Sequence, residues 1–99
     1  MIEIATACGV GMGSSLVLRM YTEDVIKLLG IQARVQALDV SQARCAKVDL
    51  ILTSPSLVSV VSGGNAVVKS VSNYVDRGLI KKALIEYCTE KGIPYKDYP

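Results

Sequence analysis

The sequence predicts an α/β fold, a three-layer sandwich in which helices cover both faces of a four-stranded parallel sheet. Short apolar runs alternate along the chain with segments whose apolar residues recur at helical spacing. The run at residues 48–53 is almost continuously apolar, which is typical of a strand buried on both faces of a parallel sheet. With 99 residues, of which 51% are hydrophobic, we expect one core and a single domain over residues 1–99.

The first half of the chain predicts two strands and one helix. Residues 2–7 form a short apolar run that ends at glycines, which favours a buried strand. Apolar side chains at helical spacing predict a helix over residues 15–29, with Gly30 placed to end it. In residues 33–37, polar and apolar side chains alternate, so we expect a strand with one solvated face near an edge of the sheet.

The second half predicts two more strands and a long C-terminal helix. After the strand at residues 48–53, a short helix is expected at residues 57–61, between Ser-Pro and Gly-Gly, followed by a strand at residues 66–72. Asp76 is a possible N-cap for the last helix, which Gly92 ends. In such a parallel sheet, ligands bind beyond the carboxyl ends of the strands, and the segment after residues 2–7 occupies such a place.

Composition excludes several classes of function. The net charge of +2 is too small to drive nucleic-acid binding, and aromatic residues for base stacking are few. The longest uncharged stretch, residues 50–68, is interrupted by Pro55 and Gly63, so we expect no membrane insertion. The N-terminus lacks the basic start and the cleavage site of a signal peptide, so the expected location is the cytoplasm.

The three cysteines, Cys8, Cys45 and Cys88, are widely spaced, and the chain has no histidine. We therefore expect no metal site, no cofactor and no disulfide. Most free cysteines are small buried hydrophobic residues, and we expect Cys45 and Cys88 to be structural. A functional role for Cys8 must follow from its surroundings.

Cys8 begins a segment that has the features of an anion-binding loop between a strand and a helix. Three glycines allow the backbone N–H groups to turn inward, and the start of the following helix adds partial positive charge. This field favours the thiolate of Cys8, which makes it the candidate nucleophile, and Ser14 and Ser15 supply hydroxyl donors. The candidate phosphate-binding residues are Gly9, Val10, Gly11, Met12, Gly13, Ser14 and Ser15.

Related motifs do not fit this segment. The glycine spacing does not match the dinucleotide fingerprint, and no Lys-Ser or Lys-Thr pair completes a Walker A loop. A cysteine phosphatase would have an arginine at the position of Ser14 to clamp the phosphate. From these residues a phosphoryl carrier is favoured, while a small cysteine phosphatase and a noncatalytic anion-binding module remain alternatives.

The stretch Ile4-Ala5-Thr6-Ala7-Cys8-Gly9-Val10-Gly11-Met12-Gly13-Ser14-Ser15-Leu16 resembles a known family. The chain is similar over its whole length to the IIB components of the bacterial phosphoenolpyruvate-dependent sugar phosphotransferase system. Within that family it most resembles the ascorbate branch, with relatives for galactitol and for lactose or cellobiose. The resemblance implies a Rossmann-like sheet, for which we expect the order 2-1-3-4, and a phosphocysteine at Cys8.

The resemblance also implies the partners of the protein. Phosphoryl groups would arrive from a phosphohistidine on a IIA protein and leave to a sugar, expected to be ascorbate-like, bound in a membrane IIC protein. Val10 and Met12, apolar residues in an otherwise polar segment, are candidates for docking these partners. The polar residues that follow other strands, Asp39, Thr53, Ser54 and Ser56, either line the same edge or form local backbone caps.

Overall fold

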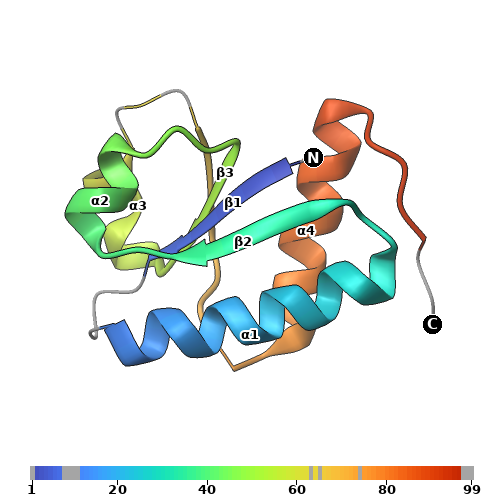
Figure 1. Ribbon diagram of the computed structural model, residues 1–99, viewed down its shortest axis with the longest axis horizontal. Coiled ribbons are helices and arrows are strands. Elements are labelled where there is room, and N and C mark those ends of the chain that lie inside the picture. The colour runs from blue at the N-terminus through green and yellow to red at the C-terminus, as the bar shows by residue number, and fades with distance from the viewer. Residues whose placement is uncertain (1, 8–11, 63, 65, 74, 97–99) are drawn as a thin grey trace.

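A parallel sheet forms the middle layer of the computed structural model (Figure 1). The structure describes residues 2–7, 12–62, 64, 66–73 and 75–96, with the backbone alone for residues 12–15. The elements are β1 (Ile2–Ala7), α1 (Met12–Leu29), β2 (Ala33–Ala37), α2 (Val40–Cys45), β3 (Leu50–Thr53), the 3-10 turn η1 (Pro55–Leu57), α3 (Val58–Val61), β4 (Val67–Ser70) and α4 (Arg77–Lys91). The strand order is β2-β1-β3-β4 and every pairing is parallel, which confirms the predicted fold class and order.

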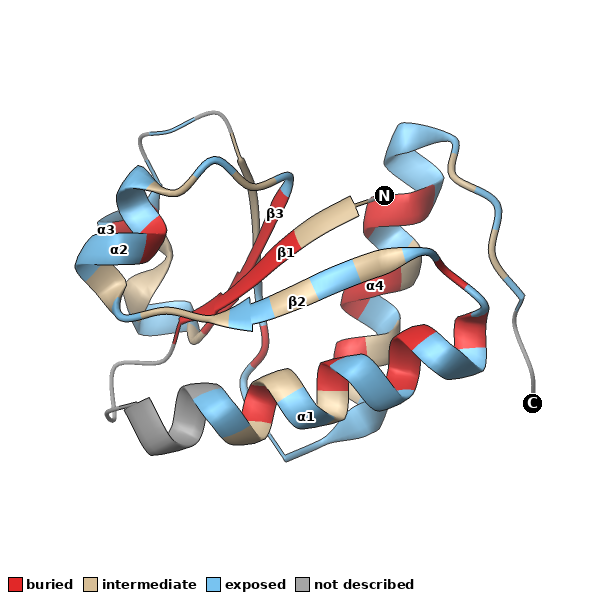
Figure 2. Ribbon diagram, in the orientation of Figure 1, coloured by how far each residue is buried: buried red, intermediate tan, exposed pale blue. Residues whose placement is uncertain are grey.

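Helices cover both faces of this sheet and bury two separate apolar clusters (Figures 1 and 2). Helices α1 and α4 pack on one face, where the larger cluster includes Ile4 of β1 and Leu52 of β3. Helices α2 and α3 lie on the other face, where the smaller cluster includes Ala5 and Ile51. Successive side chains of a strand point to opposite faces, so the central strands β1 and β3 feed both clusters in turn.

The two edge strands are less buried than the central pair. In β2, Arg34 and Gln36 are exposed while Ala33, Val35 and Ala37 are half-buried, as the alternating sequence predicted. Arg34 also forms an ion pair with Glu3 of the neighbouring strand, at 3.3 Å. The edge position therefore explains why this strand tolerates a polar residue at every second place.

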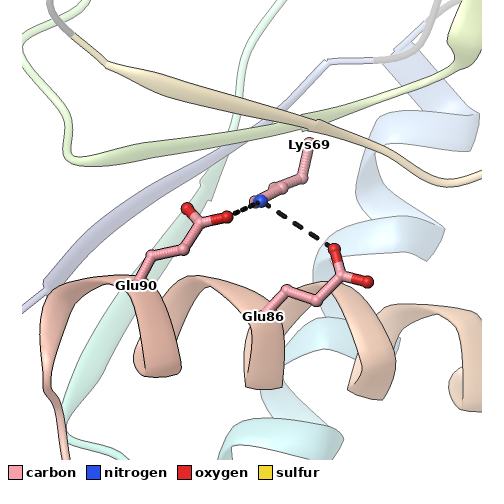
Figure 3. A network of polar contacts seen from close by, with 3 residues as sticks. All are labelled: Lys69, Glu86 and Glu90. Atoms are coloured by element: carbon pink, nitrogen blue, oxygen red, sulfur yellow. Dashed lines mark hydrogen bonds and ion pairs between the residues drawn. The ribbon is translucent and has the colours of Figure 1, made fainter.

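Strand β4, on the opposite edge, is tied to helix α4 by a lysine (Figure 3). The ammonium of Lys69 lies 2.6 Å from a carboxylate oxygen of Glu90 and 3.8 Å from one of Glu86. The two glutamates are one helical turn apart, so both face the same strand residue. This network links the edge strand β4 to the C-terminal half of α4.

Several boundaries differ from the predicted ones by a few residues. Strand β3 begins at Leu50 rather than at residue 48, and the residue before it, Asp49, is exposed and bonds to the backbone of Glu3. Its carboxylate accepts from the Glu3 N–H at 2.8 Å, and its own N–H donates to the Glu3 carbonyl at 2.8 Å. The predicted short helix at residues 57–61 is divided into η1 and α3, and strand β4 is shorter than the predicted 66–72.

The ends of the long helices follow the predicted signals. Asp76 caps α4 by accepting hydrogen bonds from the N–H groups of Gly78 and Leu79, at 2.9 and 3.3 Å. Helices α1 and α4 are followed by Gly30 and Gly92, with φ values of 67° and 68°. Glycine adopts this left-handed conformation at little steric cost, which explains both terminations.

Helix α2 was absent from the prediction. It has only six residues, which is too few for a recognisable apolar period, but it begins with a capping box. The Asp39 carboxylate accepts from the Gln42 N–H at 2.7 Å, and the Gln42 side chain accepts from the Asp39 N–H at 3.2 Å. The last residue of α2, Cys45, is exposed, so the expectation of a buried structural cysteine is wrong there, whereas Cys88 in α4 is buried.

Candidate functional site

The carboxyl ends of the four parallel strands meet at one edge of the sheet. In the central pair, Ala7 ends β1 and Thr53 ends β3, and these two residues are register partners. The chain leaves β1 through α1 on one face and enters β3 from α2 on the other face. Neighbouring strands whose connections diverge in this way define a topological switch point, where α/β proteins of this kind bind ligands.

The candidate nucleophile follows this switch point directly in the sequence. Cys8 is the residue after Ala7, and α1 begins at Met12. Cys8, Gly9, Val10 and Gly11 lie outside the described residues, so their proposed roles stay predictions. The structure does establish that the segment they form connects the carboxyl end of β1 to the amino end of α1.

Helix α1 begins three residues earlier than the sequence predicted. Met12, Gly13, Ser14 and Ser15 have helical backbone and form the first turn, rather than the end of a loop. The first turn of a helix accommodates glycine and serine because its N–H groups have no partners within the helix. These free donors, with the positive end of the helix dipole, lie at the end of α1 that follows Gly11.

Three of the polar residues considered for this edge have local partners. Asp39 caps α2, and hydrogen bonds from the Gln42 backbone and the Ser41 hydroxyl hold the pKa of its carboxyl below the usual value. The hydroxyls of Ser54 and Ser56 lie 3.3 Å apart in hydrogen-bond contact. The reading of these side chains as local caps and turns is therefore the one that their contacts support.

Thr53 is different from these three residues. It is 0% exposed, and its hydroxyl oxygen has no hydrogen-bond partner. Buried hydroxyls nearly always have a partner, so an unsatisfied one at the end of a central strand requires an explanation. Sequence reasoning placed Thr53 only among possible edge residues, because the missing partner shows only in three dimensions.

The arginines of α1 and α4 are engaged in contacts on the side of the molecule formed by these helices. Arg19 lies 3.2 Å from a carboxylate oxygen of Glu23, one turn further along α1. Arg77 bonds to Asp24 at 3.1 Å, and its guanidinium lies 4.2 Å from the centre of the Tyr21 ring. Both arginines thus have acidic partners within the chain.

Helix α1 also presents apolar side chains to solvent near its amino end. Leu16 is 43% exposed and Met20 is 57% exposed. Residues four apart lie on the same side of a helix, so these two side chains form one small apolar surface. This surface begins one turn after the start of α1, which makes it a candidate contact for a protein that approaches the Cys8 segment.

The described residues carry neither a metal-binding cluster nor a membrane-spanning helix. Among the described residues, no cluster of three or more histidine, cysteine, aspartate or glutamate side chains has the arrangement of a metal site. The helices in the described part of the chain are each too short or too polar to span a bilayer.

Comparison with known proteins identifies similar sequences over nearly the whole chain. Residues 3–93 match the family described as "PTS system, Lactose/Cellobiose specific IIB subunit". A relative from Mycoplasma pneumoniae, named "Ascorbate-specific PTS system EIIB component", is 35% identical over 86 residues. That alignment covers 84% of this chain and 90% of the relative.

Proposed function

Because the chain belongs to the lactose/cellobiose-type IIB family, it is a phosphotransferase component of the sugar phosphotransferase system, and we propose that Cys8 carries its phosphoryl group. The observation that supports this most directly is the position of Cys8 between β1 and α1, at the switch point of the sheet. Unpaired N–H groups at a helix start favour the anionic form of a nearby nucleophile, which is the role we propose for the start of α1 toward Cys8.

The proposed reaction has two displacements at phosphorus. The Cys8 thiolate attacks the phosphohistidine of a IIA protein, so that an S–P bond forms, the P–N bond breaks and the imidazole leaves. A sugar hydroxyl then attacks the phosphocysteine in line, the new O–P bond forms, and the thiolate leaves. The hydroxyl proton passes to a base or to solvent, and the sulfur returns to its starting state.

The residues after Cys8 would hold the transferred group. We assign this role to residues 9–15, whose backbone N–H groups donate to the phosphoryl oxygens, with hydroxyl donors from Ser14 and Ser15. The early start of α1 supports the assignment, because Met12, Gly13 and Ser14 then supply free backbone N–H donors at the positive helix end. No cofactor takes part in the proposed transfer.

A IIB component of this family acts together with IIA and IIC components. If Cys8 is the carrier, both partners must reach its sulfur. We propose that they bind in turn to overlapping surfaces, and that this takes place in the cytoplasm. The exposed apolar surface of Leu16 and Met20 lies on α1 close to its start, so it belongs to the region that either partner would cover. Val10 and Met12 remain proposed docking residues beside it.

The proposed substrate is an ascorbate-like sugar. The Mycoplasma pneumoniae relative is named for ascorbate, whereas the family description names lactose and cellobiose. The resemblance of the Cys8 segment to the ascorbate branch favours the first. Membership of the family favours the carrier over both the cysteine phosphatase and the noncatalytic binding module.

Phosphorylation followed by intact mass measurement tests the function. The protein is incubated with phosphoenolpyruvate, the general phosphotransfer proteins and an ascorbate-type IIA protein, and we expect one added phosphoryl group. Cys8→Ser should abolish the addition, whereas the matched control Cys45→Ser, at an exposed cysteine far along the chain, should retain it. Retention in Cys8→Ser would contradict the assignment.

A second step tests the acceptor. Vesicles that contain the IIC component should remove the phosphoryl group when ascorbate is added and leave it in place with lactose. Removal with lactose alone would overturn the substrate proposal. Steady turnover of p-nitrophenyl phosphate by the isolated chain would instead support a phosphatase.

A further inference from the structure

The outer edge of strand β4 is open to pairing with another strand. Among the described residues, β4 has a single neighbour in the sheet, which is β3. The N–H groups of Val67 and Val71 donate to carbonyls on the β3 side, at 3.0 and 2.8 Å. Backbone groups of a strand face alternate sides, so those of Val68 and Ser70 point away from β3. An edge of this kind offers unpaired donors and acceptors to an incoming strand.

A groove follows this open edge between β4 and helix α4. Its volume is about 380 Å³, and it is lined by residues 68–72, by Val58 of α3 and by four residues of α4. Two of the α4 residues, Lys82 and Glu86, are exposed and lie one helical turn apart. The groove therefore brings the free backbone groups of β4 and a pair of opposite charges to one surface.

The two charges in this groove have little compensation within the chain. In the part of the chain that the structure describes, the ammonium of Lys82 takes part in no ion pair. Glu86 makes the longer of the two contacts with Lys69, at 3.8 Å, and its side chain is 50% exposed (Figure 3). Lys82 can thus bind an acidic group from outside the chain, and Glu86 can bind a basic one.

A second copy of this chain supplies both charges at once. When two copies are related by a two-fold axis, their α4 helices run antiparallel, so Lys82 of each copy meets Glu86 of the other. The same axis makes the two β4 strands antiparallel neighbours. The strand side of the groove, residues 68–72, is centred on Ser70. With the axis at Ser70, Lys69 lies opposite Val71 of the second copy, which avoids a pair of like charges.

We propose that the groove along β4 is a dimer interface between two copies of this chain. The two β4 strands pair antiparallel at Ser70, where each copy donates one N–H group and accepts another. Two ion pairs between Lys82 and Glu86 link the α4 helices. Strand β3 lies between β4 and β1, so the carboxyl end of β1 stays outside this interface. The dimer is therefore compatible with phosphoryl transfer at Cys8 but does not depend on it.

Sedimentation equilibrium of the whole chain tests whether the dimer forms. The interface has two ion pairs and few strand hydrogen bonds, so we expect weak association, between about 10 μM and about 1 mM. The amide protons of Val68 and Ser70 should exchange more slowly at the high end of this range. Those of Val67 and Val71 already bond on the β3 side and should change little. A monomer at about 1 mM overturns the proposal.

Charge reversal tests the two ion pairs. Lys82→Glu and Glu86→Lys each place like charges across the axis twice, so each variant alone should dimerise about tenfold more weakly or worse. An equimolar mixture restores both ion pairs in a mixed dimer and should associate as the parent does. Lys47→Glu makes the same charge change at an exposed residue outside the groove and should leave dimerisation unchanged. A mixture that does not recover overturns the proposal.

Ser70→Pro tests the strand pairing. Proline has no N–H group, and an edge strand tolerates it where the N–H points outward, so the variant should fold and stay monomeric. Melting temperature reports folding. If Ser70→Pro does not fold, Ser70→Lys places like charges opposite each other at the axis and replaces it.

The location of any protection decides the occupant of the groove. A dimer that persists in Ser70→Pro, or that forms without slower exchange at Val68 and Ser70, lies elsewhere and overturns the proposal. Protection of these two amides only when a IIA or IIC protein is added assigns the edge to that partner, and it overturns the proposal equally.

Discussion

Replacement of Lys69 separates the two contributions that its side chain makes to the packing of β4 against α4, namely the charge of the ammonium and the burial of the methylene groups. The Lys69 side chain is only 18% exposed, while its partners Glu86 and Glu90 are 50% and 51% exposed. The ammonium of Lys69 thus belongs to an ion network that is half-exposed to solvent, whereas the methylene groups of the side chain are largely buried. Lys69→Met removes the charge and keeps the stem, whereas Lys69→Ala removes both.

The expected magnitudes differ between the two variants. Ion pairs whose carboxylates are half-exposed contribute about 1 kcal/mol or less to stability, so Lys69→Met should lower the free energy of unfolding by about 1 kcal/mol. Lys69→Ala also loses the burial of roughly three methylene groups, at about 0.8 kcal/mol each. Its total cost should therefore be about 3 kcal/mol.

Urea unfolding at low and high salt measures both contributions. Between 0.1 M and 1 M salt the Debye length falls from about 10 Å to about 3 Å, so the cost of Lys69→Met should shrink. The difference between the methionine and alanine variants should persist, because burial of the stem is not screened. Equal costs for the two variants, or a salt-independent cost above about 3 kcal/mol for Lys69→Met, would refute this reasoning.

Two other predictions follow from the caps and the thiols. Asp39→Ala should lower the melting temperature at neutral pH, because it removes the cap of α2. The pKa of Asp39 lies below its usual value in the folded state, so this difference should disappear in an acid titration as the pH falls through that lowered pKa. A penalty that persisted in acid would speak against the cap. Burial raises the pKa of the Cys88 thiol, so iodoacetamide should alkylate the exposed Cys45 well before Cys88 in the native protein, and equal rates would contradict the described burial.

The strands were predictable because their burial leaves a direct mark in the sequence. The bounds of β1 and β2 match the predicted ranges, since glycines end the first and strict alternation marks the second. For β3 the apolar run was extended backwards through Asp49, whose exposed carboxylate bonds to Glu3. The position of a carboxylate next to an apolar run depends on its contacts with the neighbouring strand, which the sequence alone does not give.

Helix α2 and the start of α1 were harder to predict for different reasons. Six residues of α2 show no clear period, although the Asp39 and Gln42 pair was a readable capping signal. The methionine, glycine and serine before residue 15 were predicted as loop, yet they belong to the first turn of α1. Propensity is weak evidence at a helix start, because residues that are unfavourable in a helix interior, such as glycine and serine, are tolerated there.

The sequence predicted the chemical groups of the candidate site but not their arrangement in space. A cysteine after a buried strand and before a glycine-rich helix start is visible in the sequence, and its role as the phosphoryl carrier stays a prediction. The unsatisfied hydroxyl of Thr53 is not visible, because it depends on the burial of β3 and on the absence of a nearby acceptor. Long-range packing therefore determines whether this hydroxyl has a hydrogen-bond partner.

Amide proton shifts on phosphorylation test most directly whether the peptide groups after Cys8 hold the phosphoryl group. Two-dimensional spectra of the nitrogen-15-labelled protein are compared before and after phosphoryl transfer. The account predicts that the largest downfield shifts occur at the amides of residues 9–15, which donate to the phosphoryl oxygens. Unchanged amides in that segment, or largest shifts at the opposite end of the sheet near Gly30 and Gly64, would contradict it.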